Sequence, residues 1–131
     1  MLDHFMLKVK DVSVSLPFYE QALGAIGFSV MAEFKERGAY GFGRSTNKPD
    51  FWVEPGGPLT PTVHFAFACD TREQVDRFHA AALAAGGIDN GAPGPRPYRE
   101  HYYGAFILDP DGHNIEAICR RPYSEGERTK T

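Results

Sequence analysis

Cysteine is scarce in this chain of 131 residues, which has only Cys69 and Cys119 and no CxxC motif. The scarcity argues against the disulfide framework of a small secreted domain, and we expect both thiols to be reduced and mostly buried. No apolar run approaches the roughly 20 residues that a transmembrane helix needs, and the amino terminus lacks the basic and then apolar pattern of a signal peptide. The sequence therefore predicts a soluble, cytoplasmic protein without a membrane partner.

A basic cluster is also missing. The chain has 14 lysine and arginine residues against 17 aspartate and glutamate residues, which gives a net charge of −3. This balance excludes a general binder of the phosphate backbone, so we expect no nucleic-acid partner. The length is that of one domain over residues 1–131, long enough to bury a core.

The most informative feature that is present is an internal repeat. Residues 4–28 recur without a gap at residues 64–88, with a constant offset of 60 residues from His4 to His64. Such a repeat predicts one supersecondary unit used twice, here as modules 1–57 and 62–120 followed by a polar tail at 121–131. The identical pairs are His4/His64, Phe5/Phe65, Phe18/Phe78, Ala22/Ala82, Leu23/Leu83, Ala25/Ala85 and Gly27/Gly87.

Apolar periodicity and turn residues predict the elements of the first module. Asp11 is expected to cap a helix that Gly27 ends. The expected strands are 2–9, 28–34, 38–43 and 51–54. The module is therefore β-α-β-β-β.

The second module is expected to repeat this order. A capping box at 71–74 opens the helix, and Gly86-Gly87 closes it. Residues 91–97 hold three prolines and two glycines, which predicts a loop that cannot run as regular strand. The expected strands are 63–69, 102–108 and 114–119, with a turn at 109–112. The fold class is therefore α+β, with two paired β-α-β-β-β modules.

Strand alternation separates polar from apolar faces. His4 and Met6 lie opposite the apolar face of the first strand, and His64 lies opposite that of its repeat, beside small alanines. Glu116 stands between apolar residues in the last strand. Because burying an unpaired carboxylate costs several kcal/mol, Glu116 needs a cation.

Two histidines and a carboxylate on three strands form a ligand set for one divalent metal ion: Fe, Mn, Zn or Ni. Singly, each residue is more often structural, but the repeat places both histidines at equivalent points. We expect His4, Met6, His64 and Glu116 to line one cavity, with each ligand at about 2.0–2.2 Å from the ion. His79, on the second helix, and His113, of opposite parity to Glu116, are not expected to be ligands.

The chain resembles the vicinal oxygen chelate superfamily, which includes glyoxalase I, extradiol dioxygenases, fosfomycin-resistance enzymes and bleomycin-resistance proteins. The resemblance rests on Asp3-His4, on residues 15–19, on Leu23-Gly24 and above all on residues 106–116. It implies curled sheets that enclose a metal, with a substrate bound through two neighbouring oxygens. It also implies that His4, His64 and Glu116 are the metal ligands.

The residue at the position of a fourth metal ligand is left open. The resemblance places it on the last strand of the first module, where either Glu54 or Trp52 matches. With Trp52 there, the site has three protein ligands. Around the site we expect Glu116 and Tyr103 to be catalytic. The expected substrate-binding residues are Met6, Tyr40, Trp52, Arg99, His101 and Tyr102.

The leading hypothesis is a divalent-metal-dependent enzyme, a lyase or dioxygenase, that acts on a small molecule through vicinal oxygens. The alternative is a metal-free protein that sequesters a small molecule, as in the bleomycin-resistance branch. A third interpretation is a structural or regulatory dimer in which the histidines are relics. We also expect a homodimer, with the cleft closed either within one chain or across two. The sequence does not identify the substrate.

Overall fold

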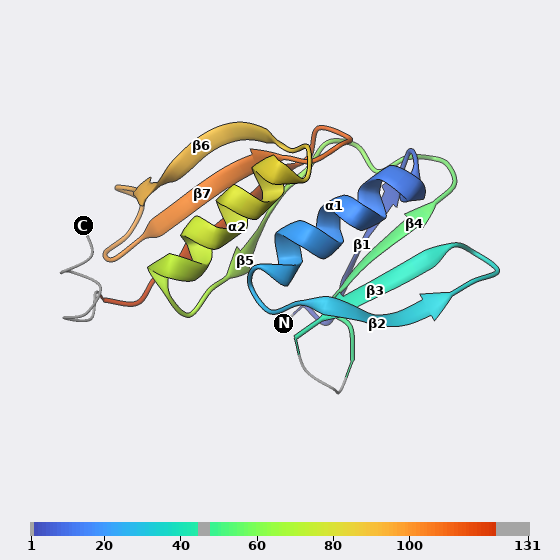
Figure 1. The fold of residues 1–131 in the computed structure, drawn as a ribbon, viewed down its shortest axis with the longest axis horizontal. Helices are drawn as coiled ribbons and strands as arrows, with labels where there is room; N and C mark the ends of the chain where they lie inside the picture. Colours follow the sequence, from blue (N-terminus) through green and yellow to red (C-terminus); the bar gives the residue numbers. More distant parts are fainter. Residues whose placement is uncertain (1, 45–47, 123–131) are drawn as a thin grey trace.

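The computed structural model of the chain describes residues 2–44 and 48–122. Its elements confirm the β-α-β-β-β order in both modules (Figure 1). The first module has β1 (Phe5–Val9), α1 (Val12–Gly24), β2 (Ser29–Phe34), β3 (Ala39–Gly43) and β4 (Phe51–Pro55). The second has β5 (His64–Ala68), α2 (Arg72–Ala84), β6 (Ile88–Pro95), β7 (Tyr103–Leu108) and β8 (Asn114–Cys119).

Each module forms one four-stranded mixed sheet. Sheet 1 has the order β1-β4-β3-β2, and sheet 2 has the equivalent order β5-β8-β7-β6. In each sheet the first and last strands of the module pair in parallel, and the other pairs are antiparallel. None of the strand pairings of the described residues joins the two sheets, so the sheets are not closed into a barrel. The α+β class is confirmed.

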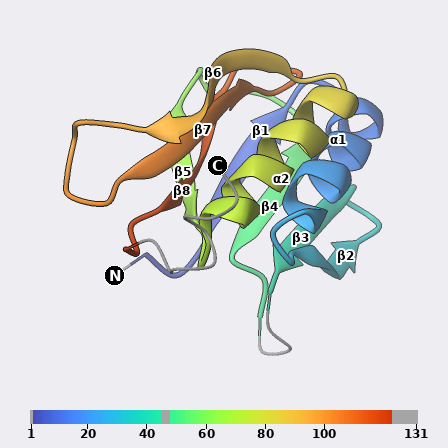
Figure 2. The ribbon, with the colours of Figure 1, turned by 60° about the vertical axis from the view of Figure 1, so that its left-hand side comes forward.

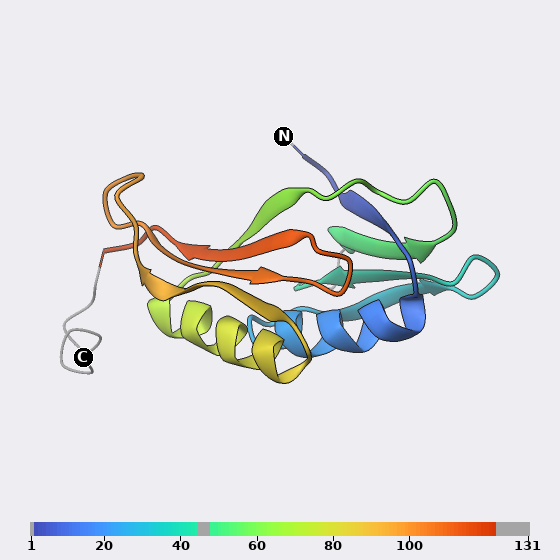
Figure 3. The same cartoon turned by 90° about the horizontal axis from the view of Figure 1, so that it is seen from above.

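The two helices form one layer beneath both sheets (Figure 3), and α1 packs beside α2. The edge strands β1 and β5 meet between the sheets, where the Phe5 and Phe65 rings lie 5.0 Å apart. The Phe28 and Phe67 rings, from the two modules, are 5.2 Å apart. The modules therefore share one core, because neither sheet could bury its apolar face alone.

Local residues fix both helix ends as the sequence predicts. The Asp11 side chain accepts a hydrogen bond from the Ser13 amide and begins α1, while Thr71 and Gln74 form the capping box that begins α2. Gly27, with φ of 90°, and Gly86, with φ of 100°, take the left-handed conformation after the helices. The chain can therefore turn back sharply into β2 and β6.

The expectation of a loop at 91–97 is wrong in its first part, because β6 runs from Ile88 to Pro95. The strand is irregular, with register shifts between Asp89 and Gly91 and between Gly91 and Gly94. It lies at the edge of sheet 2, and an edge strand tolerates proline because one side of its backbone needs no partner strand. The connection from β6 to β7 extends away from the sheet (Figure 2).

Both cysteines are free and buried, as expected. No helix among residues 2–44 and 48–122 is long and apolar enough to cross a membrane. Most of the predicted polar tail lies outside the described residues.

Strand pairing sorts each sheet into two faces. Leu7 and its partner Val53 are fully buried against the helices. Met6 and its partner Trp52 therefore lie on the opposite side, which we call the open face. In sheet 2, buried Ile115 and Ala117 mark the helix side, and Glu116 between them belongs to the open face.

Candidate functional site

His64 and Glu116 form a close pair on the open face of sheet 2. The parallel pairing of β5 with β8 places Glu116 beside Ala66, one side-chain position along from His64. The His64 Nε2 atom lies 3.0 Å from Oε1 of Glu116, whose side chain is only 3% exposed. Two ligands held at right angles by one ion at about 2.0–2.2 Å would be about this far apart.

The other ring nitrogen of His64 fixes the tautomer. Nδ1 lies 3.0 Å from the backbone oxygen of Asn114, and because a carbonyl only accepts, Nδ1 carries a proton. A neutral ring with its proton on Nδ1 has its metal-binding lone pair on Nε2, the nitrogen that faces Glu116. The His64 ring also lies 5.9 Å from the Phe106 ring on the same face.

Tyr102 completes the surroundings of Glu116. Its hydroxyl donates a hydrogen bond to Oε2 of Glu116. Burial, and after it the hydrogen bond to Glu116, raises the pKa of Tyr102 to about 12, so the phenol is protonated at neutral pH. Gly104 leaves room for this contact, since a Cβ there would lie 3.1 Å from Oε2 of Glu116.

The structure places Tyr103, expected to be catalytic, on the other face. Its hydroxyl donates to Oδ1 of Asp76 at 2.6 Å, and the Arg72 guanidinium lies 4.8 Å from its ring centre. Both partners belong to α2. Tyr102, expected to bind substrate, is instead the tyrosine whose hydroxyl reaches Glu116.

His4 lies on the open face of sheet 1, just before β1. Its Nδ1 is 2.8 Å from Oδ1 of Asp3, an arrangement that orients an imidazole and leaves Nε2 available. His4 lines a hollow of about 330 Å³, which we call the sheet 1 hollow. Its lining consists of Asp3, His4, Met6, Phe34, Arg37, Lys48, Pro49 and Trp52.

The three expected ligands do not converge within one chain. Among the described residues no group of three histidine, cysteine, aspartate or glutamate side chains is close enough to hold a metal ion. His4 and Met6 belong to the sheet 1 hollow, whereas His64 and Glu116 pair on sheet 2. The expectation of one cavity lined by all four is therefore not met inside a single chain, because the sheets remain separate.

Strand register decides between Glu54 and Trp52. Met6 pairs with Trp52 in sheet 1, and its repeat equivalent Ala66 pairs with Glu116 in sheet 2. Trp52 therefore occupies the position of Glu116. Glu54 is instead 7% exposed and engaged by two cations, at 2.7 Å from Nζ of Lys8 and 3.2 Å from Nε of Arg37.

Three other expected substrate-binding residues lie elsewhere. Tyr40 pairs with buried Val53 and packs against the core on the helix side. Arg99 and His101 are exposed in the connection between β6 and β7, and Nε2 of His101 lies 3.4 Å from Glu100. The described residues do not bring these three to the open faces.

His79 and His113 are also engaged elsewhere. The Nε2 atom of His79 is 2.9 Å from Oδ1 of Asp89, and His113 is buried, with Nδ1 accepting from the Val63 amide.

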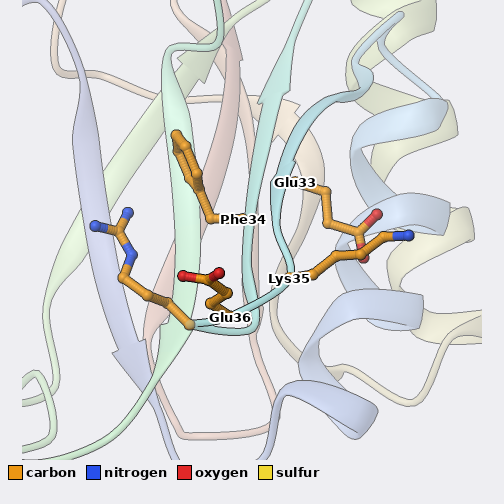
Figure 4. A pocket seen from close by; sticks show the side chains of 5 residues that line it. Glu33, Phe34, Lys35 and Glu36 are labelled. Atoms are coloured by element: carbon orange, nitrogen blue, oxygen red, sulfur yellow. The ribbon is translucent and has the colours of Figure 1, made fainter.

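Sequence reasoning missed Phe34 and Arg37. The Phe34 ring stacks on Trp52 at 5.4 Å and 19°, and the Arg37 guanidinium lies 4.7 Å from the Phe34 ring centre. Figure 4 shows the side chains of Phe34, the last residue of β2, and of Lys35 on opposite sides, with Lys35 toward the helices. A second hollow there, of about 420 Å³, is lined by residues 33–37. The alternation of side chains along β2 indicated that Phe34 and Lys35 face opposite sides. It could not show that the pairing of β2 with β3 brings Phe34 onto Trp52.

Comparisons with known proteins agree with this architecture. The family model described as Glyoxalase/Bleomycin resistance protein/Dioxygenase superfamily matches residues 1–117. The chain is similar to a crystal structure of a glyoxalase/bleomycin resistance protein from Albidiferax ferrireducens T118, with 32% identity over 92% of this chain and 98% of that one and a TM-score of 0.76.

Two more distant structures share the fold. An enzyme of the glyoxalase/bleomycin resistance protein/dioxygenase family from Burkholderia phytofirmans PsJN is 22% identical, with 92% of this chain and 98% of that chain covered and a TM-score of 0.67. A glyoxalase I mutant from Zea mays is 21% identical over 89% of this chain and 46% of that one, with a TM-score of 0.66. No curated protein sequence matches the chain.

Proposed function

This chain belongs to the glyoxalase/bleomycin resistance protein/dioxygenase superfamily, and on that premise we propose that it is a divalent-metal-dependent enzyme that acts on a small molecule bound through two neighbouring oxygens. The reaction class is that of a lyase or a dioxygenase. The proposed metal ligands are His4, His64 and Glu116.

The His64–Glu116 pair is the observation that carries the proposal. A buried carboxylate and an imidazole nitrogen face each other at 3.0 Å, while the second ring nitrogen is tied to a backbone carbonyl. His4 has the same arrangement, with Nδ1 on a carboxylate. Such outer contacts commonly orient metal-binding histidines, so the donor set fits a divalent ion.

We propose that a second copy of the chain brings the third ligand. One chain offers one ligand on sheet 1 and two ligands on sheet 2, and the described residues do not gather them. In a dimer with two-fold symmetry, sheet 1 of one copy faces sheet 2 of the other, and the same contact occurs twice. Each dimer would then hold two equivalent sites.

The residues of the site have distinct tasks. A bound divalent ion supplies Lewis acidity toward the two substrate oxygens. Tyr102 stays protonated at neutral pH and donates a hydrogen bond to Glu116, so it holds the carboxylate in one orientation. Met6 and Trp52 form an apolar wall beside His4 that excludes water from one side of the substrate.

The second candidate function is sequestration of a small molecule without metal. The sheet 1 hollow favours it, because its aromatic lining exists within one chain and needs no ion. Metal content separates the two functions, since a sequestering protein has no need of the ligand set.

The proposal is tested by element analysis of purified protein and by an activity screen of catechols, hemithioacetals and epoxides after reconstitution with Fe, Mn, Zn or Ni. We expect one ion per chain in the wild type and none in His64→Ala. His101→Ala removes an exposed histidine outside the site and should keep the ion. Wild-type protein that takes up no divalent metal, yet binds a small molecule, would support sequestration instead.

A further inference from the structure

We propose that the sheet 1 hollow binds a planar aromatic carboxylate, stacked against Trp52 and Phe34 and paired in charge with Arg37. This inference deepens the proposed function by naming a substrate class: an aromatic acid whose ring carries the two neighbouring oxygens. It rests on the proposed function for those oxygens, whereas the binding of the acid rests on the hollow alone.

Aromatic surface is the first feature that selects this ligand. Phe34 is 49% exposed although it stacks on Trp52 at 5.4 Å with an interplanar angle of 19°. The indole of Trp52 packs close to Gly41, its neighbour in β3, where a Cβ would approach the indole to 3.0 Å. Two nearly parallel rings at a hollow present a rigid, flat apolar surface, which favours another flat ring.

Charge is the second feature. Arg37 and Lys8 both pair with Glu54, while Lys48 pairs with Asp3 and Asp50, so these ion pairs around the hollow balance in charge. Glu54 engages Arg37 through Nε, and among the described residues no ion pair or hydrogen bond uses the terminal guanidinium nitrogens. A guanidinium held in this way is oriented in advance for a carboxylate, which it can bind with two parallel hydrogen bonds.

The third feature is size and position. The hollow of about 330 Å³ is at the small end of the range for ligand pockets, which suits a single substituted ring. His4 and Met6 share its lining with Arg37. An aromatic acid in the hollow would therefore lie beside both Arg37, which would bind its carboxylate, and His4, a proposed metal ligand.

Other classes of ligand would use only one of these features, the aromatic rings or the guanidinium. A neutral ring would leave the terminal guanidinium nitrogens of Arg37 without a carboxylate to bind. A flexible aliphatic acid would gain little from the stacked Trp52 and Phe34 rings and would lose more conformational entropy when it binds. Lys48 is already paired with Asp3 and Asp50, at 3.3 Å each, so it does not call for a second anion.

The single tryptophan gives a direct measurement. The indole N–H of Trp52 is one resonance in a ¹H–¹⁵N spectrum of the protein stripped of metal with EDTA. We expect benzoate to shift it saturably, with at least about tenfold weaker binding for benzamide, which lacks the charge, and for cyclohexanecarboxylate, which lacks the flat ring. No shift with benzoate, or equal affinity for either analogue, would overturn the proposal.

Matched variants locate the charge and the ring contact. In Arg37→Met, benzoate should bind no better than benzamide, whereas Lys35→Met, which removes a cation outside the lining of the sheet 1 hollow, should keep the wild-type preference. Phe34→Leu should reduce the preference for benzoate over cyclohexanecarboxylate without affecting the core, since Phe34 is half exposed. An Arg37→Met or Phe34→Leu variant that retains full selectivity would contradict the assignment.

The outcome is separate from that of the metal test. Benzoate selectivity in protein that never binds metal would support the aromatic-acid site in the hollow and contradict the proposed metal-dependent enzyme. A metal-loaded protein without benzoate selectivity would support the metal site and contradict the proposal that the substrate is an aromatic acid.

Discussion

His64 and Phe65 are neighbours in β5 with opposite surroundings. His64 is half exposed beside Glu116, whereas the Phe65 ring lies between the modules, 5.0 Å from Phe5 and 5.5 Å from Phe51. We predict that His64→Ala removes metal binding and changes the free energy of unfolding by no more than about 1 kcal/mol.

Phe65→Ala should keep metal binding but lower the free energy of unfolding by about 3 kcal/mol, because it empties part of the core. Urea unfolding and element analysis of both variants measure the two effects. Unfolding of the His64 variant with little change in the Phe65 variant would show that the two faces of β5 are inverted.

Tyr102 and Tyr103 allow a second matched comparison. The Tyr102 hydroxyl bonds to Glu116, and the Tyr103 hydroxyl bonds to Asp76 on α2. Loss of an outer contact to a metal ligand typically lowers metal affinity about 10–100-fold, so we predict that loss for Tyr102→Phe. Tyr103→Phe should bind metal like the wild type in competition with a chelator. Equal affinities for the two variants would remove Tyr102 from the site.

Part of the proposed site follows from the sequence residue by residue. The repeat and strand parity indicate His4, His64 and Glu116, because a periodic pattern is written in the sequence. The choice of Trp52 over Glu54, and of Tyr102 over Tyr103, depends on which residues pair across strands. That register is set by tertiary packing, which one sequence does not display.

Two glycines at the ends of helices have opposite roles. Gly24 is the last residue of α1 and has open space where a Cβ would lie, whereas a Cβ on Gly87 would approach the Ala82 oxygen to 2.8 Å and the Ile107 side chain to 2.7 Å. We predict that Gly24→Ala stabilises the protein by about 0.4–1 kcal/mol, since it restricts the unfolded chain. Gly87→Ala should destabilise it by about 1–3 kcal/mol through overpacking. Denaturant midpoints in the reverse order would contradict this account of the helix ends.

The turn between β7 and β8 ties the second module to the first. Buried Asp109 accepts a hydrogen bond from Tyr19 of α1 and from the amides of Asp111 and His113. Burial raises the pKa of the Asp109 carboxyl above 3.8, although these hydrogen bonds act in the opposite direction. The folded protein therefore binds this proton more tightly than the unfolded chain does.

The raised pKa predicts a pH dependence that Asp109→Asn should abolish. The stabilisation from the proton is fully present below the unfolded value of 3.8 and is lost as the pH rises through the folded value. Between about pH 7 and about pH 4, the wild type should therefore gain stability relative to Asp109→Asn, which keeps an acceptor for the two amides. Urea unfolding at both pH values measures the difference. A wild type that loses stability relative to the variant on acidification would show that the Asp109 pKa is lowered.

β6 shows why composition alone misled the prediction for one element. Glycine and proline normally break strands, and a Cβ on Gly91, where φ is 153°, would approach the Phe106 ring to 2.9 Å. The residues that break a regular strand allow this one to bulge twice while it stays paired with β7. An edge position, visible only in the sheet order, makes that possible.

At the scale of the whole molecule, two similar modules share a core but keep their sheets apart. The sequence predicted the modules because the repeat is long and in register. It left open whether the cleft closes in one chain or across two, because the relative placement of two sheets depends on interfaces rather than on local patterns. With the proposed ligands, one on sheet 1 and two on sheet 2, a two-fold dimer would complete two sites.

Metal content after mixing two inactive variants tests this central claim most directly. His4→Ala lacks the ligand of sheet 1, and His64→Ala lacks a ligand of sheet 2, so neither should hold the ion alone. After unfolding and refolding an equimolar mixture, half of the dimers should pair one variant with the other and carry one intact site, which restores about a quarter of the wild-type metal. A site built within one chain would stay broken in every molecule, and a mixture as poor in metal as its two components would contradict the account.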